Sequence, residues 1–470
     1  MPGPRHALAA AGLALLLSGC AAFRSYDAEL YPALEQASSG NVDGAIRLLE
    51  SNNRLPDKDL LYFMELGMLQ RLGNRYDESQ KAWTAAEARI GFLRSDSFAE
   101  LTSLVSGASS YLLNDKLRVY QGHDYERVML LTYMALNHLA RGDYDSARVA
   151  IRQTHEFEAQ IAEQRAKQYA QVEEEARKRG ARTSVRELNG YPVQTIDNPA
   201  VNALRNSYQS ALSHYLAGFV YEALGEPSLA APGYRLAIEL QPDRPLLEEG
   251  LRGLDARVAA PDDGMTEVLF IIESGTAPAL QSRQFALPMW VQGRFLVLSH
   301  SFPVIVATSP PSWPRRVVAD GKELPVAAVA SVDAMARRRL KDEMPEIMLR
   351  ATIRSTTAAV LQYQTQRAAA GNDRASLAAA LASAAVTVGS AALASADDRT
   401  WRALPADIFI ARGRLPRGAH TVTLDTSDGP RSARVEVSGR YAVVDFRLLR
   451  QQVFVNAPRA PAASGGGPRP

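Results

Sequence analysis

Apolar residues recur at helical spacing through the first half of this chain and at strand spacing through the second half. From about residue 26 to residue 258 they return every three to four positions, which predicts α-helices. After the turn-rich stretch Pro261–Gly264, short apolar runs such as 267–272 are separated by Pro, Gly and Ser, which predicts strands. The expected fold class is therefore multidomain, with an α region followed by an α+β region.

The helical half, over residues 20–260, shows internal repetition. The turn positions Gly40, Asn74 and Gly142 lie 34 and 68 residues apart, which are one and two lengths of the tetratricopeptide repeat. The spacing predicts tetratricopeptide-like helical hairpins, with independent helical pairs as the alternative. Small residues are needed where paired helices touch, and aromatic residues fill the holes beside them. The residues expected to pack the repeats are Gly67, Ala135, Gly142, Ala147, Gly218, Tyr221, Gly225, Ala230, Tyr234 and Ala237.

Two long helices, 143–179 and 199–224, are expected to form a projecting hairpin. The first contains no Gly or Pro before Gly180, and Pro199 suits the first turn of the second. The helix faces that usually bind peptides in tetratricopeptide proteins are mostly apolar here, so we expect another part of the chain or a permanent partner to cover them. These residues are Leu61, Met64, Met68, Arg71, Met129, Thr132, Leu136, Leu139, Leu212, Tyr215, Phe219 and Glu222.

The second half is expected to be a mostly antiparallel β domain over residues 265–450. Its strands are predicted within 265–330 and 405–450, where the turn Asp320-Gly321 is typical of a β-hairpin. Between them, residues 331–400 predict a helical insertion.

Within this insertion the run 375–396 contains no charged residue and is long enough to cross a membrane. Its Ala and Ser content favours a helix buried in the protein, with insertion into a membrane or an oligomer as the alternative. The Pro-, Ala- and Gly-rich tail, 457–470, is predicted to be disordered.

The N-terminal stretch has the pattern of an export signal over residues 1–19. Arg5 and His6 precede an apolar run, 7–17, which at ~16 Å as a helix is too short to span a bilayer of ~30 Å. The tetrapeptide ending at Cys20 resembles the lipobox of bacterial lipoproteins, in which the cysteine carries acyl chains such as palmitate. An ordinary secretory signal is the alternative.

Cys20 is the only cysteine, so its lipidation would leave none for a disulfide or a thiolate site. Three acyl chains would form a stable membrane anchor. By the same resemblance to lipoproteins, Ala21 favours transfer to the outer membrane, because a residue other than Asp follows the cysteine. The expected location is the periplasmic face of the outer membrane.

Composition and motifs give little sign of catalysis. A net charge of +2 gives no electrostatic case for nucleic acid. His155-Glu156 lacks the second histidine of a zinc-protease helix, and there is no phosphate loop or Gly-x-Ser-x-Gly elbow. We therefore expect no metal, no cofactor and no enzymatic activity. Glu273, Trp401, Leu404 and Pro405 are possible interaction residues; an ordinary strand-end turn and a core tryptophan are the alternatives.

Three stretches together resemble a family of uncharacterised, tetratricopeptide-containing bacterial outer-membrane lipoproteins. They are Tyr125-Glu126-Arg127-Val128 with Tyr133–Asn137, then 215–227, and Asp398-Arg399-Thr400-Trp401 leading to Leu404-Pro405-Ala406. The resemblance implies a loose association with small lipoproteins that activate peptidoglycan synthases, and it brings no catalytic residues.

The expected function is that of a non-enzymatic scaffold or adaptor for a cell-envelope assembly, which would bind an envelope protein through its helical repeats. The alternative is a periplasmic glycan-binding or hydrolytic enzyme that uses carboxylates of the C-terminal α+β domain.

Overall fold

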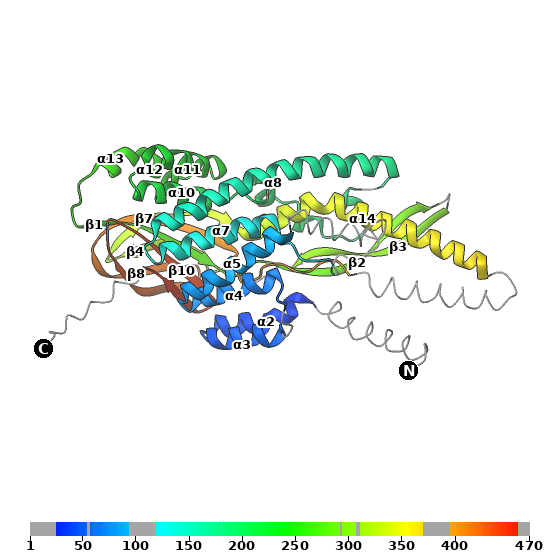
Figure 1. The fold of residues 1–470 in the computed structure, drawn as a ribbon, viewed down its shortest axis with the longest axis horizontal. Helices are drawn as coiled ribbons and strands as arrows, with labels where there is room; N and C mark the ends of the chain where they lie inside the picture. The colour runs from blue at the N-terminus through cyan, green and yellow to red at the C-terminus, as the bar shows by residue number, and fades with distance from the viewer. Residues whose placement is uncertain are drawn as a thin grey trace.

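The structure, a computed structural model, describes residues 25–53, 57–93, 116, 118–181, 183–291, 294–306, 311–369 and 395–458. A helical region is followed by a mixed, sheet-rich region with a helical insertion, as expected from the sequence (Figure 1). Cys20, most of the run 375–396 and nearly all of the C-terminal tail lie outside the described residues.

Consecutive helices pair as hairpins in the first half. At their crossings there is no room for a Cβ atom: one built on Gly67 would lie 2.2 Å from the Trp83 indole nitrogen, and one on Gly218 would lie 2.7 Å from the Tyr234 ring. The pairs are α2 (Tyr26–Ser38) with α3 (Val42–Asn52), α4 (Leu60–Leu72) with α5 (Tyr76–Leu93), α7 (Asp124–Leu139) with α8 (Tyr144–Arg179), and α10 (Ala211–Ala223) with α11 (Pro227–Leu240).

The other residues expected to pack the repeats lie at these crossings and turns. Gly142 and Gly225 have φ angles of 73° and 76° in the turns that follow α7 and α10, a conformation that favours glycine. The remaining six are buried, namely Ala135, Ala147, Tyr221, Ala230, Tyr234 and Ala237.

The long helix α8 has the expected signals at both ends. The Asp143 side chain accepts the Ser146 N–H at 3.0 Å, and Gly180 ends the helix in the left-handed conformation. Near its far end, Ala176 packs against Leu349 and Ile353 of α14 (Val332–Ala369).

The expected continuous helix over 199–224 is wrong. The chain forms the short helix α9 (Pro199–Ala203) and begins α10 only at Ala211. Asn206 explains the break, because its side chain accepts the N–H groups of Tyr208 and Gln209 and so offers the backbone an alternative to the helix. No hairpin of two long helices therefore forms. Short helices complete the region: η3 (Val185–Glu187), η4 (Val193–Thr195), α12 (Pro245–Arg252) and α13 (Leu254–Ala259).

The strands form two sheets and one separate hairpin. The five-stranded sheet has the order β11-β10-β1-β7-β6, and its β1–β10 pair is parallel whereas the others are antiparallel. Its strands are β1 (Met265–Ser274), β6 (Val326–Ser331), β7 (Asp407–Pro416), β10 (Tyr441–Leu449) and β11 (Gln452–Asn456).

The four-stranded sheet has the order β5-β4-β8-β9, and β2 pairs only with β3 among the described strands. Sequence patterns did not indicate β2, β5 or β11, and the apolar runs 294–298 and 303–307 predicted two strands where β3 is continuous. The remaining strands are β2 (Ala279–Val291), β3 (Arg294–Val306), β4 (Pro314–Ala319), β5 (Lys322–Leu324), β8 (Gly418–Thr426) and β9 (Gly429–Val437).

The largest core joins helices to the five-stranded sheet across the boundary expected near residue 260. The helix faces expected to be covered are all buried, and the chain itself covers them. At this helix–sheet seam Arg71 on α4 pairs with Asp445 on β10 at 2.8 Å, and Glu222 on α10 pairs with Arg412 on β7 at 2.5 Å. Among the described residues no helix combines the length and apolar composition that a membrane span requires.

We predict that Gly218→Ala destabilises the fold by about 1–3 kcal/mol, because the added methyl would overpack the Tyr234 ring. Gly91→Ala is the matched control. Gly91 is exposed on α5 and a Cβ built on it would meet nothing within 4 Å, so the substitution should add about 1 kcal/mol of stability. Urea unfolding of both variants measures the difference, and equal effects would contradict the crossing geometry.

Candidate functional site

Residues 395–406, here named the inner segment, run between the helical hairpins and the sheet before entering β7. At one end of the segment, the N–H of Ala277 donates to the Leu404 carbonyl at 2.6 Å and the N–H of Ala406 donates to the Ser274 carbonyl at 2.9 Å. Over residues 397–404 the segment lies against α4 and α7, the first helices of two hairpins. It thus covers the inner faces of these two helices.

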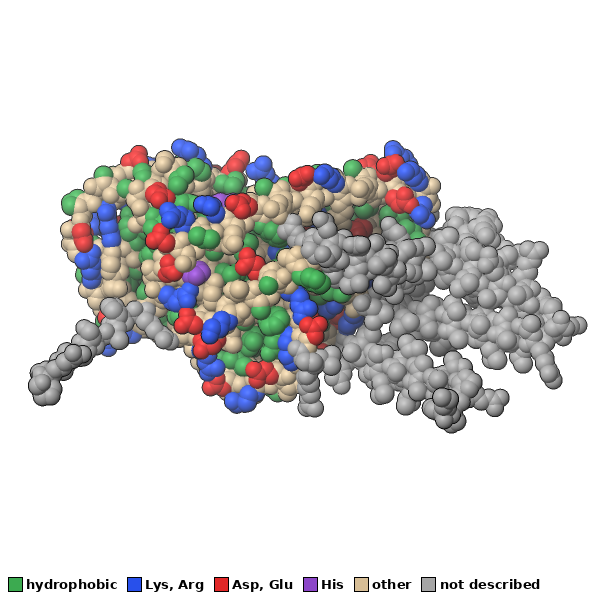
Figure 2. Space-filling model, in the orientation of Figure 1, with side chains coloured by type: hydrophobic (Ala, Val, Ile, Leu, Met, Phe, Trp, Pro, Cys, Tyr) green, Lys and Arg blue, Asp and Glu red, His purple; other side chains and the backbone are tan. Residues whose placement is uncertain are grey.

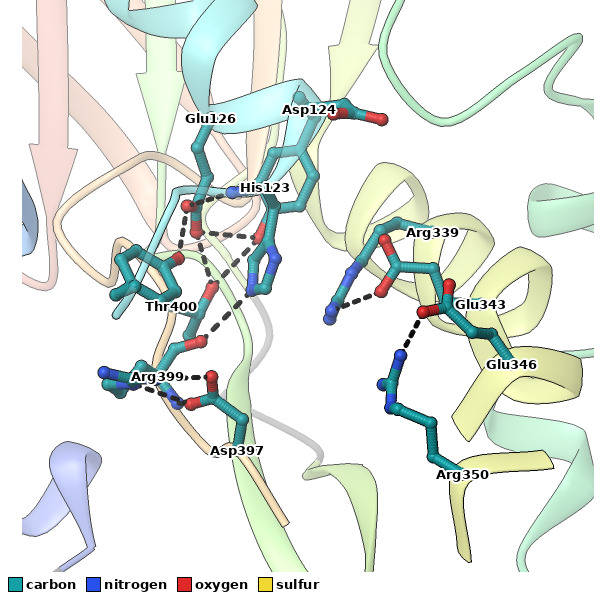
Figure 3. A network of polar contacts seen from close by, with 12 residues as sticks. His123, Asp124, Glu126, Arg339, Glu343, Glu346, Arg350, Asp397, Arg399 and Thr400 are labelled. Atoms are coloured by element: carbon teal, nitrogen blue, oxygen red, sulfur yellow. Dashed lines mark hydrogen bonds and ion pairs between the residues drawn. The ribbon is translucent and has the colours of Figure 1, made fainter. Parts of the chain in front are cut away.

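Glu126 of α7 is fully buried and holds the middle of the inner segment. Its Oε1 accepts the Thr400 hydroxyl at 3.0 Å and its Oε2 accepts the His123 N–H at 2.9 Å (Figure 3). Oε1 also accepts the Trp401 N–H at 2.7 Å, and Oε2 accepts the Tyr120 hydroxyl. One carboxylate thereby fixes both the inner segment and the start of α7.

Glu65 of α4, also fully buried, holds the next two residues. The N–H groups of Arg402 and Ala403 donate to its two oxygens at 2.7 and 3.0 Å. Burial raises the pKa of Glu65 to about 8, even though the two N–H donors favour the ionised form.

The four residues expected as interaction sites are buried, so their contacts in this structure are internal. Trp401 lies between the hairpins, with its ring centroid 6.2 Å from those of Trp83 and Tyr133. Glu273, on β1, lies 3.6 Å from the Arg447 guanidinium, and burial together with Asp445 raises its pKa to about 8. Leu404 and Pro405 are buried as well. A tryptophan filling the core agrees with the alternative stated for Trp401.

A charged pocket of about 310 Å³ opens beside the inner segment. Figure 3 shows its two sides: Asp397 and His123 on one, and the α14 residues Arg339 and Glu343 on the other. Further lining residues come from the loop before α7 and from the middle of α8. The charged residues of its wall are Arg118, Asp124, Arg127, Arg165, Arg339, Glu343, Glu346, Arg350 and Asp397.

Most of the ionic groups of this pocket pair with one another. Arg165 of α8 bridges Asp124 at 2.5 Å and Glu343 at 2.8 Å, and Arg339 pairs with the second oxygen of Glu343 at 2.5 Å. On the next turn of α14, Glu346 pairs with Arg350. The pairs link α7, α8 and α14, so they brace three helices that are distant in the chain.

The pairing sets the protonation of the pocket. Burial alone would raise the pKa of Glu343, but Arg339 and Arg165 outweigh it and hold the pKa at about 2. Burial and the nearby Arg339 lower the pKa of His123. Its Nε2 lies 3.1 Å from the Arg399 carbonyl, which can only accept, so Nε2 carries the hydrogen. Glu343 is therefore ionised at neutral pH, and the His123 Nε2–H is directed at the Arg399 carbonyl.

Among the described residues no cluster of His, Cys, Asp or Glu is arranged to hold a metal ion. No protein-family model, curated protein or solved structure matches the chain.

Sequence reasoning missed Glu65, Glu126 and the pocket. A lone glutamate in an amphipathic helix normally faces water, and nothing along the chain indicates that these two meet backbone N–H groups about 275 to 340 residues away. The one available signal was the Tyr125-Glu126 pair, which belongs to a stretch of the family resemblance.

The raised pKa of Glu65 predicts a pH-dependent stability. Between the ordinary value of 4.5 and about 8, the folded protein holds a proton that the unfolded chain releases. This contribution to stability is therefore complete below pH 4.5 and is lost as the pH rises through 8.

In Glu65→Gln, the fall in unfolding free energy between pH 5 and pH 8 should be smaller than in the unsubstituted protein, because the titrating group is absent. The NH₂ group of the new glutamine cannot accept a hydrogen bond, so one of the two backbone N–H groups, of Arg402 or Ala403, would lose its acceptor. The variant should therefore be less stable than the unsubstituted protein at both pH values, by about 1–3 kcal/mol. Urea unfolding at the two pH values measures both effects, and an unchanged pH dependence would refute the assignment.

Proposed function

We propose that the protein is a lipid-anchored, non-enzymatic scaffold of the cell envelope, held at the periplasmic face of the outer membrane through Cys20. The observation that carries this proposal is that the chain's own inner segment and sheet fill the face of the helical hairpins. Passing peptides would have to displace this segment, whose hydrogen bonds to Glu65 and Glu126 each contribute about 1 kcal/mol net, so the face does not act as an open clamp.

In this proposal the hairpins are tetratricopeptide-like repeats whose inner face has become part of the protein core. The glycine–aromatic crossings at Gly67 and Gly218 support it, because close approach of paired helices is what such repeats require. Partner proteins would then bind the outer faces, which include exposed apolar residues such as Val149 on α8 and Leu229 on α11.

The outer surface also bears on the class of partner. Figure 2 shows basic and acidic side chains interspersed over one face of the molecule, without a field of a single sign. Such a surface suits protein contacts better than nucleic acid, which attracts a continuous basic patch. The proposed partner is an envelope protein.

A glycan-binding or hydrolytic enzyme is the second candidate, and the charged pocket is the place where it would act. Hydrolysis of a glycosidic bond needs one protonated and one ionised carboxyl group facing the same bond. In the pocket Arg339 and Arg165 lower the pKa of Glu343, and Arg399 lowers the pKa of Asp397, whereas Glu65 and Glu273, whose pKa values are strongly raised, are buried in the core. The arrangement favours the scaffold.

Cell fractionation tests the anchor. Cys20→Ser should move the protein from the membrane to the soluble periplasmic fraction, since it removes the acylated thiol. Ala21→Asp, which keeps the cysteine, should leave the protein membrane-bound but shift it from the outer to the inner membrane in a density gradient. A Cys20→Ser protein that stays in the membrane fraction would refute the anchor.

Site-specific photocrosslinking in cells tests the scaffold. A photoreactive residue at Val149 or Leu229 should capture one or a few envelope proteins, identified by mass spectrometry, because both positions lie on outer helix faces. The control position is Ser438, exposed in the turn after β9, where no capture is expected. Absence of capture at the helix positions, together with activity of the purified protein on glycans, would favour the second candidate.

A further inference from the structure

The ion pairs of the charged pocket leave it with a surplus of positive charge. Its described wall holds five arginines and four carboxylates, and Arg399 holds Asp397 from outside the wall, so together there are six arginines and four carboxylates. Asp397 accepts hydrogen bonds from the backbone N–H, Nε and Nη2 of Arg399. Glu343 is shared by Arg165 and Arg339. The pocket therefore has more cationic groups than its own carboxylates neutralise.

Two of these arginines have hydrogen-bond donors that no described residue accepts. The Arg339 Nε–H is buried and lacks an acceptor, although Nη2 of the same side chain pairs with Glu343. The Arg118 side chain is exposed at the pocket wall and pairs with no described residue; only its backbone carbonyl is used, by Arg399. Figure 3 shows the Arg339 guanidinium directed from α14 toward the side that carries His123. The pocket thus offers N–H donors from two of its walls.

Apolar side chains line other parts of the wall. Val119, next to Arg118, has 57% of its surface exposed, and Ile161, Pro303 and Ile347 also line the pocket. A hydrated inorganic ion uses none of these apolar groups, whereas an organic ligand with an anionic head covers them and removes apolar surface from water. The volume of about 310 Å³ lies at the lower end of the range for small-molecule sites, about 300–1,000 Å³.

We propose that the charged pocket binds a small organic anion, a molecule with a carboxylate or phosphate group on a short apolar body. Arg118 and Arg339 hold the anionic group by charge-assisted hydrogen bonds, which are roughly twice as strong as neutral ones, and Val119 covers the apolar body. A planar guanidinium matches the paired oxygens of either group. Glu343 and Asp397 repel such a ligand only weakly, because arginines already pair with both. The site does not depend on the lipid anchor, and it adds a ligand to the proposed scaffold.

NMR titration measures binding with three probes that have similar short alkyl chains, namely hexanoate, hexyl phosphate and hexan-1-ol. The protein is the chain without its predicted export signal and with Cys20→Ser, in about 0.15 M sodium chloride so that weak surface attraction is screened. Hexanoate or hexyl phosphate, or both, should bind one molecule per chain. Hexan-1-ol, which lacks the charge, should bind at least about tenfold more weakly. The anion that binds more tightly identifies the class of the natural ligand.

Two variants test the arginines. Arg118→Gln should weaken binding of the preferred anion at least about tenfold without changing the thermal unfolding midpoint, because this side chain pairs with no described residue. Arg339→Lys keeps a cation beside Glu343 but removes the Nε–H donor, so binding should weaken several-fold. The matched control is Arg434→Gln, which removes an exposed arginine of β9 outside the pocket and should leave binding unchanged.

Three results would overturn the proposal. They are no binding of either anion, equal affinity for hexan-1-ol and the anions, and a loss of binding in Arg118→Gln no larger than that in Arg434→Gln, which would mean attraction to net charge alone. None of them bears on the capture of partner proteins at Val149 and Leu229, so failure of this proposal and failure of the scaffold are seen in separate experiments.

Discussion

Two buried glutamates that accept backbone N–H groups are the constraint on which this structure depends. Glu65 and Glu126 stand on the first helices of neighbouring hairpins and bind consecutive residues of the inner segment. Each N–H group left without an acceptor in the core would cost about 1–3 kcal/mol. The two glutamates therefore determine where the segment lies, and with it the position of β7 and of the Trp401 ring between the hairpins.

The helix–sheet seam adds a second kind of constraint. Arg71 with Asp445 and Glu222 with Arg412 are ion pairs almost completely removed from water. Buried pairs of this kind contribute little net stability, because the cost of desolvation offsets their attraction. If the sheet shifted along the helices, a pair would break and leave an unpaired charge in the core. We therefore interpret the pairs as fixing the position at which the sheet packs on the helices.

The sequence predicted the helical half best, because helix contacts are local in the chain. Glycine and aromatic spacing located the hairpins, and the all-round apolar helices predicted that another part of the chain or a permanent partner would cover their inner faces; the chain itself does so. The break before α10 was missed because one asparagine side chain, Asn206, decides it. β3 was predicted as two strands because the polar residues Ser299–Ser301 interrupt its apolar run. The inner segment and the charged pocket depend on contacts across most of the chain, and no local pattern contains them.

The contacts that close the fold join its two ends. The Tyr26 N–H meets Asp398, and Glu35 of α2 pairs with Arg450, 415 residues later. Contacts this distant in sequence form slowly. The helical hairpins, synthesised first, must therefore wait with their apolar inner faces uncovered until β10 and the residues after it are available. During that interval the chain has the surface of an aggregation-prone intermediate, and a chaperone that holds unfolded chains would protect it.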